Sequence, residues 1–309
     1  EQEISLRAFP EKFANIEAFQ MDSQSPMYYI TSHYDTVFDC PGAIDNASAV
    51  AVMLECAFIL SQSEYKNRVN FVSFTLEEFN PSWVFNRFQK MQELNLMDEN
   101  YRYNTYHISN IMQFYKKDTW NKRREGISPA FAILQFLKEN KQKLPQNVIK
   151  FINYDYDLYK NYNHTDIWGK SVLYGSDKWV SAKLKGLKDI KGIINLDSLA
   201  YKDDNSQASI TTDFIREFDD LSENPNIKQN QVPSLLIFAN ENSKDIMDSF
   251  FESSNIQGLK TQRIYIPAKF DWIAKHQIDA LRSDHASFWK RNIPAIFVTD
   301  FNDSPNPYY

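Results

Sequence analysis

A strand–helix–strand unit between residues 27 and 75 constrains the fold of this chain more than any other feature of the sequence. Residues 27–32 and 69–75 are rich in β-branched and aromatic side chains, which is typical of buried strands. The residues that follow Asn46 are apolar on most faces, which predicts a helix packed against a sheet. Two strands joined by such a helix pair in parallel through a right-handed crossover. The unit therefore predicts an α/β fold.

Further strands and helices are predicted along the rest of the chain. Apolar runs predict strands at 13–20, 192–196, 234–239, 263–266 and 295–299, and helical spacing predicts helices at 176–185 and 245–254. Between residues 80 and 167 the character changes, because three aromatic-rich segments with helical spacing follow one another, at 83–96, 108–120 and 129–141. We therefore expect a single domain over residues 1–309, with a helical insertion over residues 80–167.

Acidic and imidazole side chains stand at the ends of the predicted strands or in the loops beside them. They are His33, Asp35, Asp45, Glu77, Glu78, Asp197 and His285. Because ligands of open α/β sheets gather at the carboxyl ends of the strands, we expect these side chains to converge. Taken singly, each has a simpler explanation, such as a solvated acidic pair at Glu77-Glu78 or a helix start at Asp284-His285. The prediction of a shared site rests on their conjunction.

The chemistry of this set predicts two metal ions, which we expect to be zinc. Zinc binds imidazole nitrogen and carboxylate oxygen, and a catalytic zinc keeps one position open for water. Two zinc ions about 3.5–4 Å apart need a bridging ligand, and we predict Asp45 in that role. His33 and Asp197 would complete one site, and Glu78 and His285 the other. Manganese or cobalt would fit the same ligands.

Two further residues are expected to act beside the metal ligands. Glu77 is adjacent to a ligand and points to the other side of the strand end, so it is free to act as a general base. Asp35 lies two residues beyond His33 along an extended strand and is predicted to accept the imidazole N–H. Such a contact would fix the tautomer of the ring and raise its basicity.

Composition disfavours several other classes of protein. The net charge of −6 and the pI near 5.5 give no support for nucleic-acid binding. No apolar run approaches about 18 residues, so no membrane span is expected. The chain begins at Glu1 without a signal peptide or an initiator Met, and we expect a processed product or part of a longer chain. Cys40 and Cys56 are interpreted as unpaired thiols.

Eight short motifs follow one another in a characteristic order. They are His33-Tyr34-Asp35, Gly42-Ala43-Ile44-Asp45-Asn46-Ala47-Ser48, Glu77-Glu78, Leu173-Tyr174-Gly175-Ser176, Asn195-Leu196-Asp197, Ser283-Asp284-His285, Ile293-Pro294-Ala295 and Asn306-Pro307-Tyr308-Tyr309. In this order they resemble the co-catalytic di-zinc aminopeptidases, the group that includes bacterial leucyl aminopeptidases and the peptidase domain of glutamate carboxypeptidases. The resemblance covers residues 13–80 and 168–309.

The resemblance implies a three-layer zinc-exopeptidase fold, in which a mixed, largely parallel central sheet is flanked by helices. It implies the same roles for the five metal ligands, with Asp45 as bridge and Glu77 as base. It also implies a cis peptide bond between Asp45 and Asn46, and it favours a secreted or periplasmic location. The family joins its Glu-Glu pair to its Leu-x-Gly-Ser segment within a few residues, whereas residues 79–172 intervene here.

The expected function is that of a zinc-dependent aminopeptidase, which hydrolyses the N-terminal peptide bond of a peptide substrate with a hydroxide that bridges the two metal ions. One alternative is a glutaminyl cyclase-like, single-zinc acyltransferase, although such enzymes typically carry Ser where this chain has Asn46. Another is a non-catalytic binding protein on a peptidase scaffold, although no metal ligand is lost here. The sequence predicts no particular oligomeric state.

The insertion carries two open interpretations of its own. It is either a cap that narrows the cleft beside the metal ions or a flank that stabilises the domain without touching the substrate. Its basic cluster, Lys116-Lys117 with Lys122-Arg123-Arg124, is either a solvated face or a contact for an acidic substrate or a partner.

Overall fold

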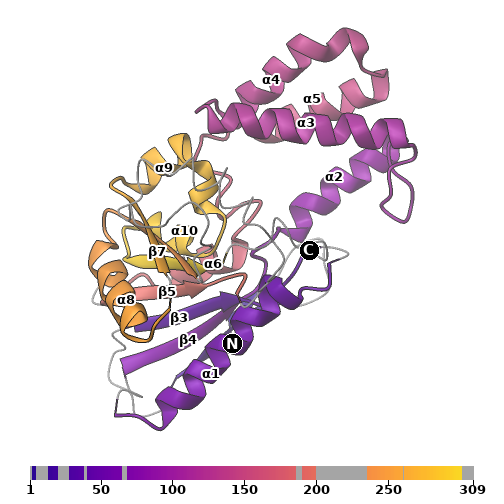
Figure 1. Cartoon of the computed structure of the whole chain (residues 1–309). Helices are drawn as coiled ribbons and strands as arrows, with labels where there is room; N and C mark the ends of the chain where they lie inside the picture. The colour runs from indigo at the N-terminus through magenta and orange to yellow at the C-terminus, as the bar shows by residue number, and fades with distance from the viewer. Residues whose placement is uncertain are drawn as a thin grey trace.

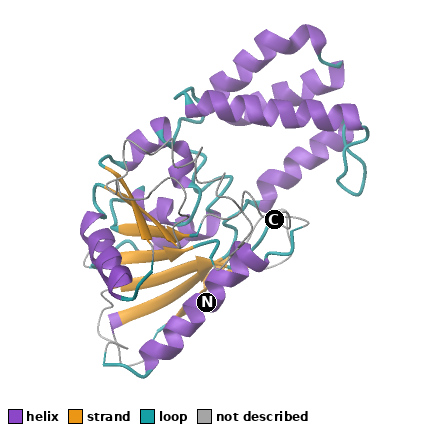
Figure 2. Cartoon of the chain, in the orientation of Figure 1, coloured by secondary structure: helices purple, strands orange, loops and turns teal. Residues whose placement is uncertain are grey.

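The computed structural model of the chain describes residues 2–4, 13–19, 28–37, 40–64, 68–185, 190–199, 235–259 and 261–300. The motif at 306–309 lies outside the described residues. Eight strands form one sheet in the order β1-β2-β4-β3-β5-β8-β6-β7 (Figures 1 and 2). The strands are β1 (Gln2–Ile4), β2 (Phe13–Ala18), β3 (Tyr28–His33), β4 (Val69–Phe74), β5 (Gly192–Leu196), β6 (Leu235–Asn240), β7 (Thr261–Ile266) and β8 (Ala295–Thr299).

The middle of the sheet is parallel, and antiparallel pairs lie toward its two edges. Strands β4, β3, β5 and β8 run parallel to one another. On one side β2 is antiparallel to β4, and β1 is antiparallel to β2. On the other side β6 is antiparallel to β8, and β7 is parallel to β6. The predicted α/β fold with a mixed, largely parallel sheet is confirmed.

Helices cover both faces of this sheet. Outside the insertion they are η1 (Ala43–Ser48), α1 (Ala49–Ser61), α6 (Tyr174–Lys183), α8 (Lys244–Ile256), α9 (Phe270–His276), η5 (Ile278–Leu281) and α10 (His285–Trp289). Helices α1 and α8 share a core with Ile30 and Ile237, whereas α6, α9 and α10 share the opposite core with Tyr29 and Phe238. Neighbouring strand residues thus point to opposite faces, as the period of two requires. The result is a three-layer arrangement.

Helix α1 is more apolar than its contacts with the sheet require. Ala49 and Met53 are buried against the sheet, but Leu54, Phe58 and Ile59 are exposed. Within the described ranges, the helical stretch Ala43–Ser61 is long and apolar enough to cross a membrane by length and composition, with a hydropathy of 1.7. A core helix of a soluble protein passes the same test, so the prediction that the chain has no membrane span stays a prediction.

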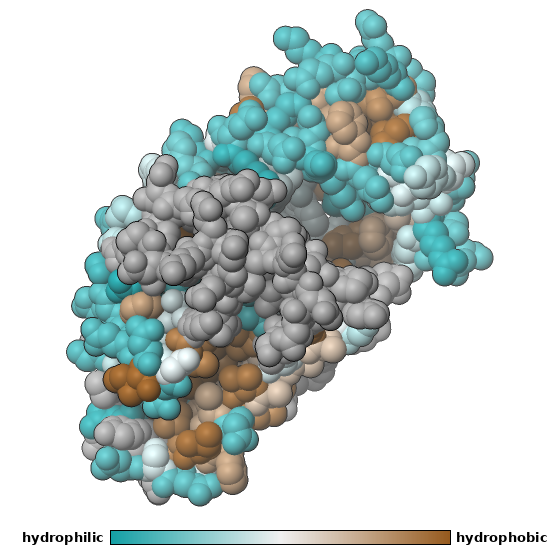
Figure 3. Space-filling model, viewed as in Figure 1, coloured by the Kyte–Doolittle hydropathy of each residue, from teal (hydrophilic) through white to brown (hydrophobic). Residues whose placement is uncertain are grey.

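Residues 81–159 form a helical arm that extends from the sheet (Figure 1). Its helices are α2 (Pro81–Glu93), α3 (Tyr106–Arg124), α4 (Pro129–Asn140), the short η3 (Lys141–Lys143) and α5 (Gln146–Tyr159). They enclose a hydrophobic core of their own, with Met112, Phe136 and Phe151 fully buried, and the side of the arm in view is mainly hydrophilic (Figure 3). That this arm is an insertion in a single domain stays a prediction.

The chain leaves the sheet for the arm and returns to it at the same place. The side chain of Asn80 caps α2 by accepting a hydrogen bond from the N–H of Ser82, and Pro81 occupies the first turn. The backbone N–H of Asn80 donates to the carbonyl of Ser171 at 2.7 Å. The N–H groups of Leu173 and Tyr174 donate to the carbonyls of Glu77 and Leu76 at 2.8 and 2.9 Å. The arm is therefore anchored directly beside the Glu77-Glu78 pair.

Replacing Gly175 by alanine is expected to destabilise the protein by about 1–3 kcal/mol, because helix α6 approaches the end of β4 too closely for a side chain. A Cβ atom at Gly175 would lie 1.8 Å from the carbonyl oxygen of Thr75. Gly258→Ala is the control, since a Cβ there meets nothing within 4 Å and only its positive φ is strained. Urea denaturation of both variants measures the difference, and equal destabilisation would contradict the close approach of α6.

Candidate metal centre

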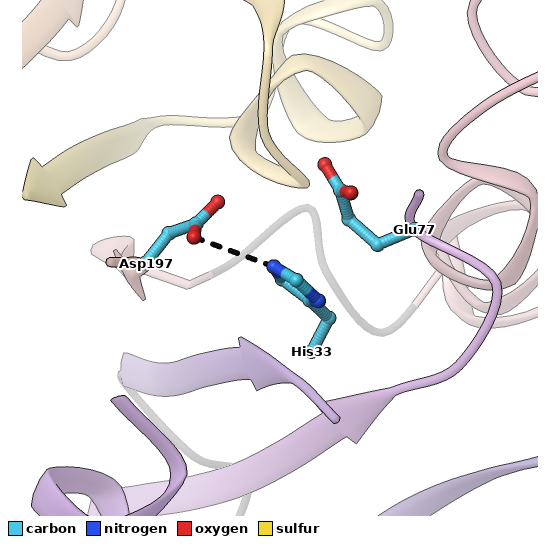
Figure 4. Close-up of side chains that lie close together, drawn as sticks. All are labelled: His33, Glu77 and Asp197. Carbon is cyan, nitrogen blue, oxygen red and sulfur yellow. Dashed lines mark hydrogen bonds and ion pairs between the residues drawn. The ribbon is translucent and has the colours of Figure 1, made fainter. Parts of the chain in front are cut away.

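Three parallel strands deliver polar side chains to one point at their carboxyl ends. His33 is the last residue of β3, Glu77 follows β4 after a short turn, and Asp197 directly follows β5. These three side chains point toward one another, and all three are buried (Figure 4). Asp45 belongs to η1, which directly precedes α1, the helix that connects β3 to β4. The predicted convergence at the strand ends is therefore present.

Two groups of candidate metal ligands are found among the described residues. In the first, ligand atoms of His33, Glu77 and Asp197 lie within 4.8 Å of one another. In the second, the same holds for His33, Asp45 and Glu78. The imidazole belongs to both groups, since its Nε2 lies 3.1 Å from Asp45 Oδ1 and 3.3 Å from Asp197 Oδ1. Four of the five predicted ligands and the predicted base are thus brought together.

His285 is the predicted ligand that the structure does not bring into either group. Its Nε2 lies 2.8 Å from the carbonyl oxygen of Ala280, and its ring stacks on Phe297 with a centroid distance of 4.8 Å. Its neighbour Asp284 is fully buried, and its carboxyl interacts electrostatically with His33 and Asp197. Asp284, for which the sequence predicted no role, is therefore the residue of this motif whose charge acts on the acidic site.

Asp35 has a different contact from the one predicted. The Nδ1 atom of His33 lies 3.1 Å from the main-chain oxygen of Asp35 and 3.7 Å from its carboxylate, and the longer distance exceeds a hydrogen bond. The carboxylate instead accepts the backbone N–H groups of Glu77 and Glu78, at 3.1 and 3.2 Å. Asp35 thereby holds the imidazole through its backbone and the Glu-Glu pair through its side chain.

A network of buried hydrogen bonds fixes Asp197. The hydroxyl of Ser283 donates to Asp197 Oδ2 at 2.5 Å, and the hydroxyl of Ser198 donates to Oδ1 at 3.2 Å. The amide of Asn195 donates to the Ser283 hydroxyl at 2.7 Å. Ser283 and Asn195 belong to the same two motifs as His285 and Asp197, so their part in the site is to orient a neighbouring acid.

The loop that carries Asp45 is joined to the end of β5. The peptide bond between Asp45 and Asn46 is cis, which confirms the expectation from the resemblance. The side chain of Asn46 donates to the carbonyl of Leu196 at 3.3 Å and accepts the N–H of Ser198 at 3.1 Å. This pair of contacts holds the loop of Asp45 beside Asp197, and both carboxylates lie near His33 Nε2.

The electrostatics of the site favour a bound cation. Burial raises the pKa of Glu77 well above its usual value, and the charges of Glu78 and Asp284 raise it further against the effect of His33. Burial and the charge of Asp45 raise the pKa of Glu78 to about 9, and burial raises that of Asp284 to about 7. Burial favours a neutral His33, but Asp197 and Glu77 outweigh it and raise the imidazole pKa.

Closely spaced buried carboxylates of this kind are costly unless a positive charge compensates them. The Oε1 atom of Glu78 is buried and has no hydrogen-bond partner among the described residues. One imidazole and several carboxylates are the donors that zinc takes in proteins. The residues present therefore fit a divalent metal ion.

A pocket opens from this centre toward the helical arm. The four acidic side chains that line it at the centre are Asp45, Glu77, Glu78 and Asp197. Helices α2, α3 and α5 line it on the other side, with aromatic side chains such as Trp83, Trp120 and Tyr159. The candidate metal centre and the arm thus share one cavity.

Comparison with known proteins finds a family match for the part of the chain that contains most of the candidate metal ligands. Residues 16–93 match the sequence model for peptidase family M28. This segment is similar to that family. It contains His33, Asp35, Asp45, Glu77 and Glu78, so the resemblance inferred from the motifs is confirmed.

Individual aminopeptidases give shorter or weaker matches than the M28 model. A 50-residue stretch is 44% identical to Aminopeptidase YwaD of Bacillus subtilis strain 168, and it covers 16% of this chain and 11% of that protein. The LapA aminopeptidase of Legionella pneumophila is 13% identical with a TM-score of 0.47, covering 99% of this chain and 49% of that one. The zinc aminopeptidase BSAP of Bacillus subtilis is 15% identical with a TM-score of 0.42, covering 93% and 39%. The chain spans less than half the length of these relatives.

Proposed function

We propose that this chain is a zinc-dependent aminopeptidase that hydrolyses the N-terminal peptide bond of peptide substrates. The observation that carries the proposal is the presence of two adjacent groups of candidate ligands, His33 with Glu77 and Asp197, and His33 with Asp45 and Glu78. The M28 segment supports a peptidase, and the relative at 44% identity supports an aminopeptidase.

We propose two zinc ions, for which Asp45 would be the shared ligand. His33 and Asp197 would hold one ion, and Glu78 and His285 would hold the other. Two adjacent ligand groups, one that includes Asp197 and one that includes Asp45 and Glu78, support two neighbouring ions, of which His33 can bind one. His285 takes part only if its ring gives up the contact with the carbonyl of Ala280. Zinc supplies a Lewis acid for the scissile carbonyl and lowers the pKa of a bound water toward neutrality.

In the proposed reaction, Glu77 moves the protons. It accepts a proton from the attacking water and gives it to the amine that leaves. Asp35 supports this role, because it holds the backbone of Glu77 through a hydrogen bond of 3.1 Å. The acidic side chains of the centre also provide a site for the positively charged α-amine of the substrate, which explains the preference for an N-terminal residue.

Chelation of the metal ions is expected to abolish hydrolysis of aminoacyl-p-nitroanilides, and zinc is expected to restore it. Elemental analysis of the zinc-loaded protein is expected to give two zinc ions per chain, and His285→Ala is expected to lower this number. Manganese and cobalt are added to the chelated protein in parallel, since the donor set also fits them.

Three results would contradict the proposal. Protein supplied with zinc that binds no transition metal would exclude a metallopeptidase. Hydrolysis that continues after complete chelation would show that the activity does not depend on a metal ion. One tightly held zinc with formation of pyroglutamate from N-terminal glutamine would favour a glutaminyl cyclase instead.

A further inference from the structure

The pocket beside the metal centre is lined by basic as well as acidic side chains. Beyond the metal centre, its charged lining residues within the described ranges are Arg87, Lys116, Arg123, Asp155 and Arg282. Asp155 neutralises Arg87 through two hydrogen bonds of 2.8 and 2.6 Å. The remaining three side chains are cations, and Arg123 also interacts electrostatically with the buried Asp279, which lies outside the pocket lining.

Arg123 is the most deeply placed of these cations. It lies in the last turn of α3 with only 9% of its surface exposed, and its Nη2 atom has no hydrogen-bond partner among the described residues. The guanidinium lies over the ring of Trp120, at 4.8 Å from the centroid. Burial lowers the pKa of Arg123 to about 10, so the side chain still carries its charge at neutral pH.

The last turn of α3 is held firmly against the sheet domain. Asp279 of η5 is buried, and it accepts a hydrogen bond from Trp120 Nε1 at 3.3 Å and pairs with Arg124 Nε at 2.6 Å. Gly126, with a φ of 82°, ends the helix where a Cβ would lie 3.4 Å from the carbonyl of Lys275. Arg123 therefore occupies a defined position in the pocket, although it belongs to the arm.

A buried guanidinium with unsatisfied N–H groups is costly, and an arginine fork matches the two oxygens of a carboxylate. We propose that Arg123 binds a carboxylate of the peptide substrate, and that the arm thereby selects substrates with a negative charge near the scissile bond. The carboxylate comes either from the C-terminus of a short peptide or from an acidic side chain. This inference rests on the proposed aminopeptidase function.

Matched peptides test the inference without any change to the protein. Leu-Gly-Gly is compared with its C-terminal amide, which differs only in the terminal charge. Leu-Glu-Gly amide is compared with Leu-Gln-Gly amide, which differ only in the side-chain charge. We expect kcat/KM to be about 10- to 100-fold higher for the carboxylate member of at least one pair, as for a hydrogen bond to a charged group. The pair that shows the difference identifies the source of the carboxylate.

Substitution then assigns the preference to Arg123. Arg123→Gln is expected to reduce the ratio between carboxylate and amide to near one, and Arg123→Lys is expected to restore only part of it. The control is Lys117→Gln, which removes a charge from an exposed residue of α3 that does not line the pocket. This control is expected to keep the full ratio. A ratio near one in the unmodified protein, or an unchanged ratio in Arg123→Gln, would overturn the inference.

Binding without turnover separates this inference from the proposed function. Titration calorimetry with Glu77→Gln measures the Kd of the same peptide pairs. Tighter binding of the carboxylate peptides, lost with Arg123→Gln, supports the anion site even if the chain hydrolyses no peptide. Equal Kd values within both pairs overturn it even if the chain is an active aminopeptidase.

Discussion

Replacing Glu77 by glutamine is expected to lower kcat by a factor of about 10²–10⁴ while the protein keeps its bound metal. Glutamine has nearly the same shape as glutamate, but its amide cannot accept the proton of an attacking water. The loss should appear in kcat, because the Glu77 carboxylate acts in the proton-transfer step and not in substrate binding.

The setting of Glu77 supports this expectation. The side chain is 6% exposed, and its backbone N–H is held by Asp35 at 3.1 Å. Burial raises its pKa, and the charges of Glu78 and Asp284 add to this effect while His33 opposes it. Shifted pKa values of this kind are common at catalytic sites. Glu77 also lies within 4.8 Å of His33 and Asp197, beside the predicted metal ligands.

Two measurements test the role of Glu77. Steady-state kinetics with an aminoacyl-p-nitroanilide give kcat, and elemental analysis gives the metal content of the same sample. Glu78→Gln is the matched control, since it changes the neighbouring carboxylate and is expected to lower the metal content. Full activity in Glu77→Gln would show that another group is the base, and loss of metal would show that Glu77 is itself a ligand.

The sequence predicts most of the centre because strand ends are simple to locate. Short apolar runs mark β3, β4 and β5, and the residue that follows such a run lies at the carboxyl edge of a parallel sheet. His33, Glu77 and Asp197 were placed in this way, and the structure brings their ligand atoms together. For His33, the last residue of β3, the direction of the side chain also follows from the period of two.

The contacts of His285 could not be predicted from the sequence in the same way. Asp284 and His285 stand at the start of α10, and successive residues of a helix point about 100° apart. The packing of α10 against β8 decides whether Asp284 or His285 points toward the metal centre. The orientation of α10 in that packing cannot be read from the sequence. In the structure, the ring of His285 packs on Phe297 of β8, and Asp284 interacts with the acidic site instead.

Helix α5 is not predicted from the sequence, because its helical pattern is weak. The segment 146–159 contains Asn, Asp and several aromatic and β-branched residues, all of which are weak helix formers. Its buried residues nevertheless follow helical spacing, with Val148, Ile152 and Asp155 on one face. An acid among the buried positions weakens the apolar pattern, and its partner Arg87 lies far away in the sequence.

That buried acid gives the second large expected effect, since replacing Asp155 by alanine is expected to destabilise the arm by about 3–5 kcal/mol. Asp155 is 1% exposed, and it binds Arg87 of α2 through both oxygens and accepts a hydrogen bond from the hydroxyl of Tyr115 of α3 at 3.2 Å. One carboxylate thus joins three helices. Burial opposes the charge of Arg87, but Asp155 outweighs it and raises the guanidinium pKa. Without Asp155, the partly buried charge of Arg87 is left uncompensated.

A double-mutant cycle followed by urea denaturation separates the pair from simple packing. The double variant Arg87→Met with Asp155→Ala is expected to recover part of the loss, because removing both charges also removes the cost of burying one alone. The control is Glu93→Ala, which breaks the exposed pair with Lys90 and is expected to cost less than about 1 kcal/mol. If Asp155→Ala is no less stable than this control, the pair does not hold the arm together. If the arm does depend on the pair, Asp155→Ala should also displace Arg123, and the preference for carboxylate peptides should weaken in the same variant.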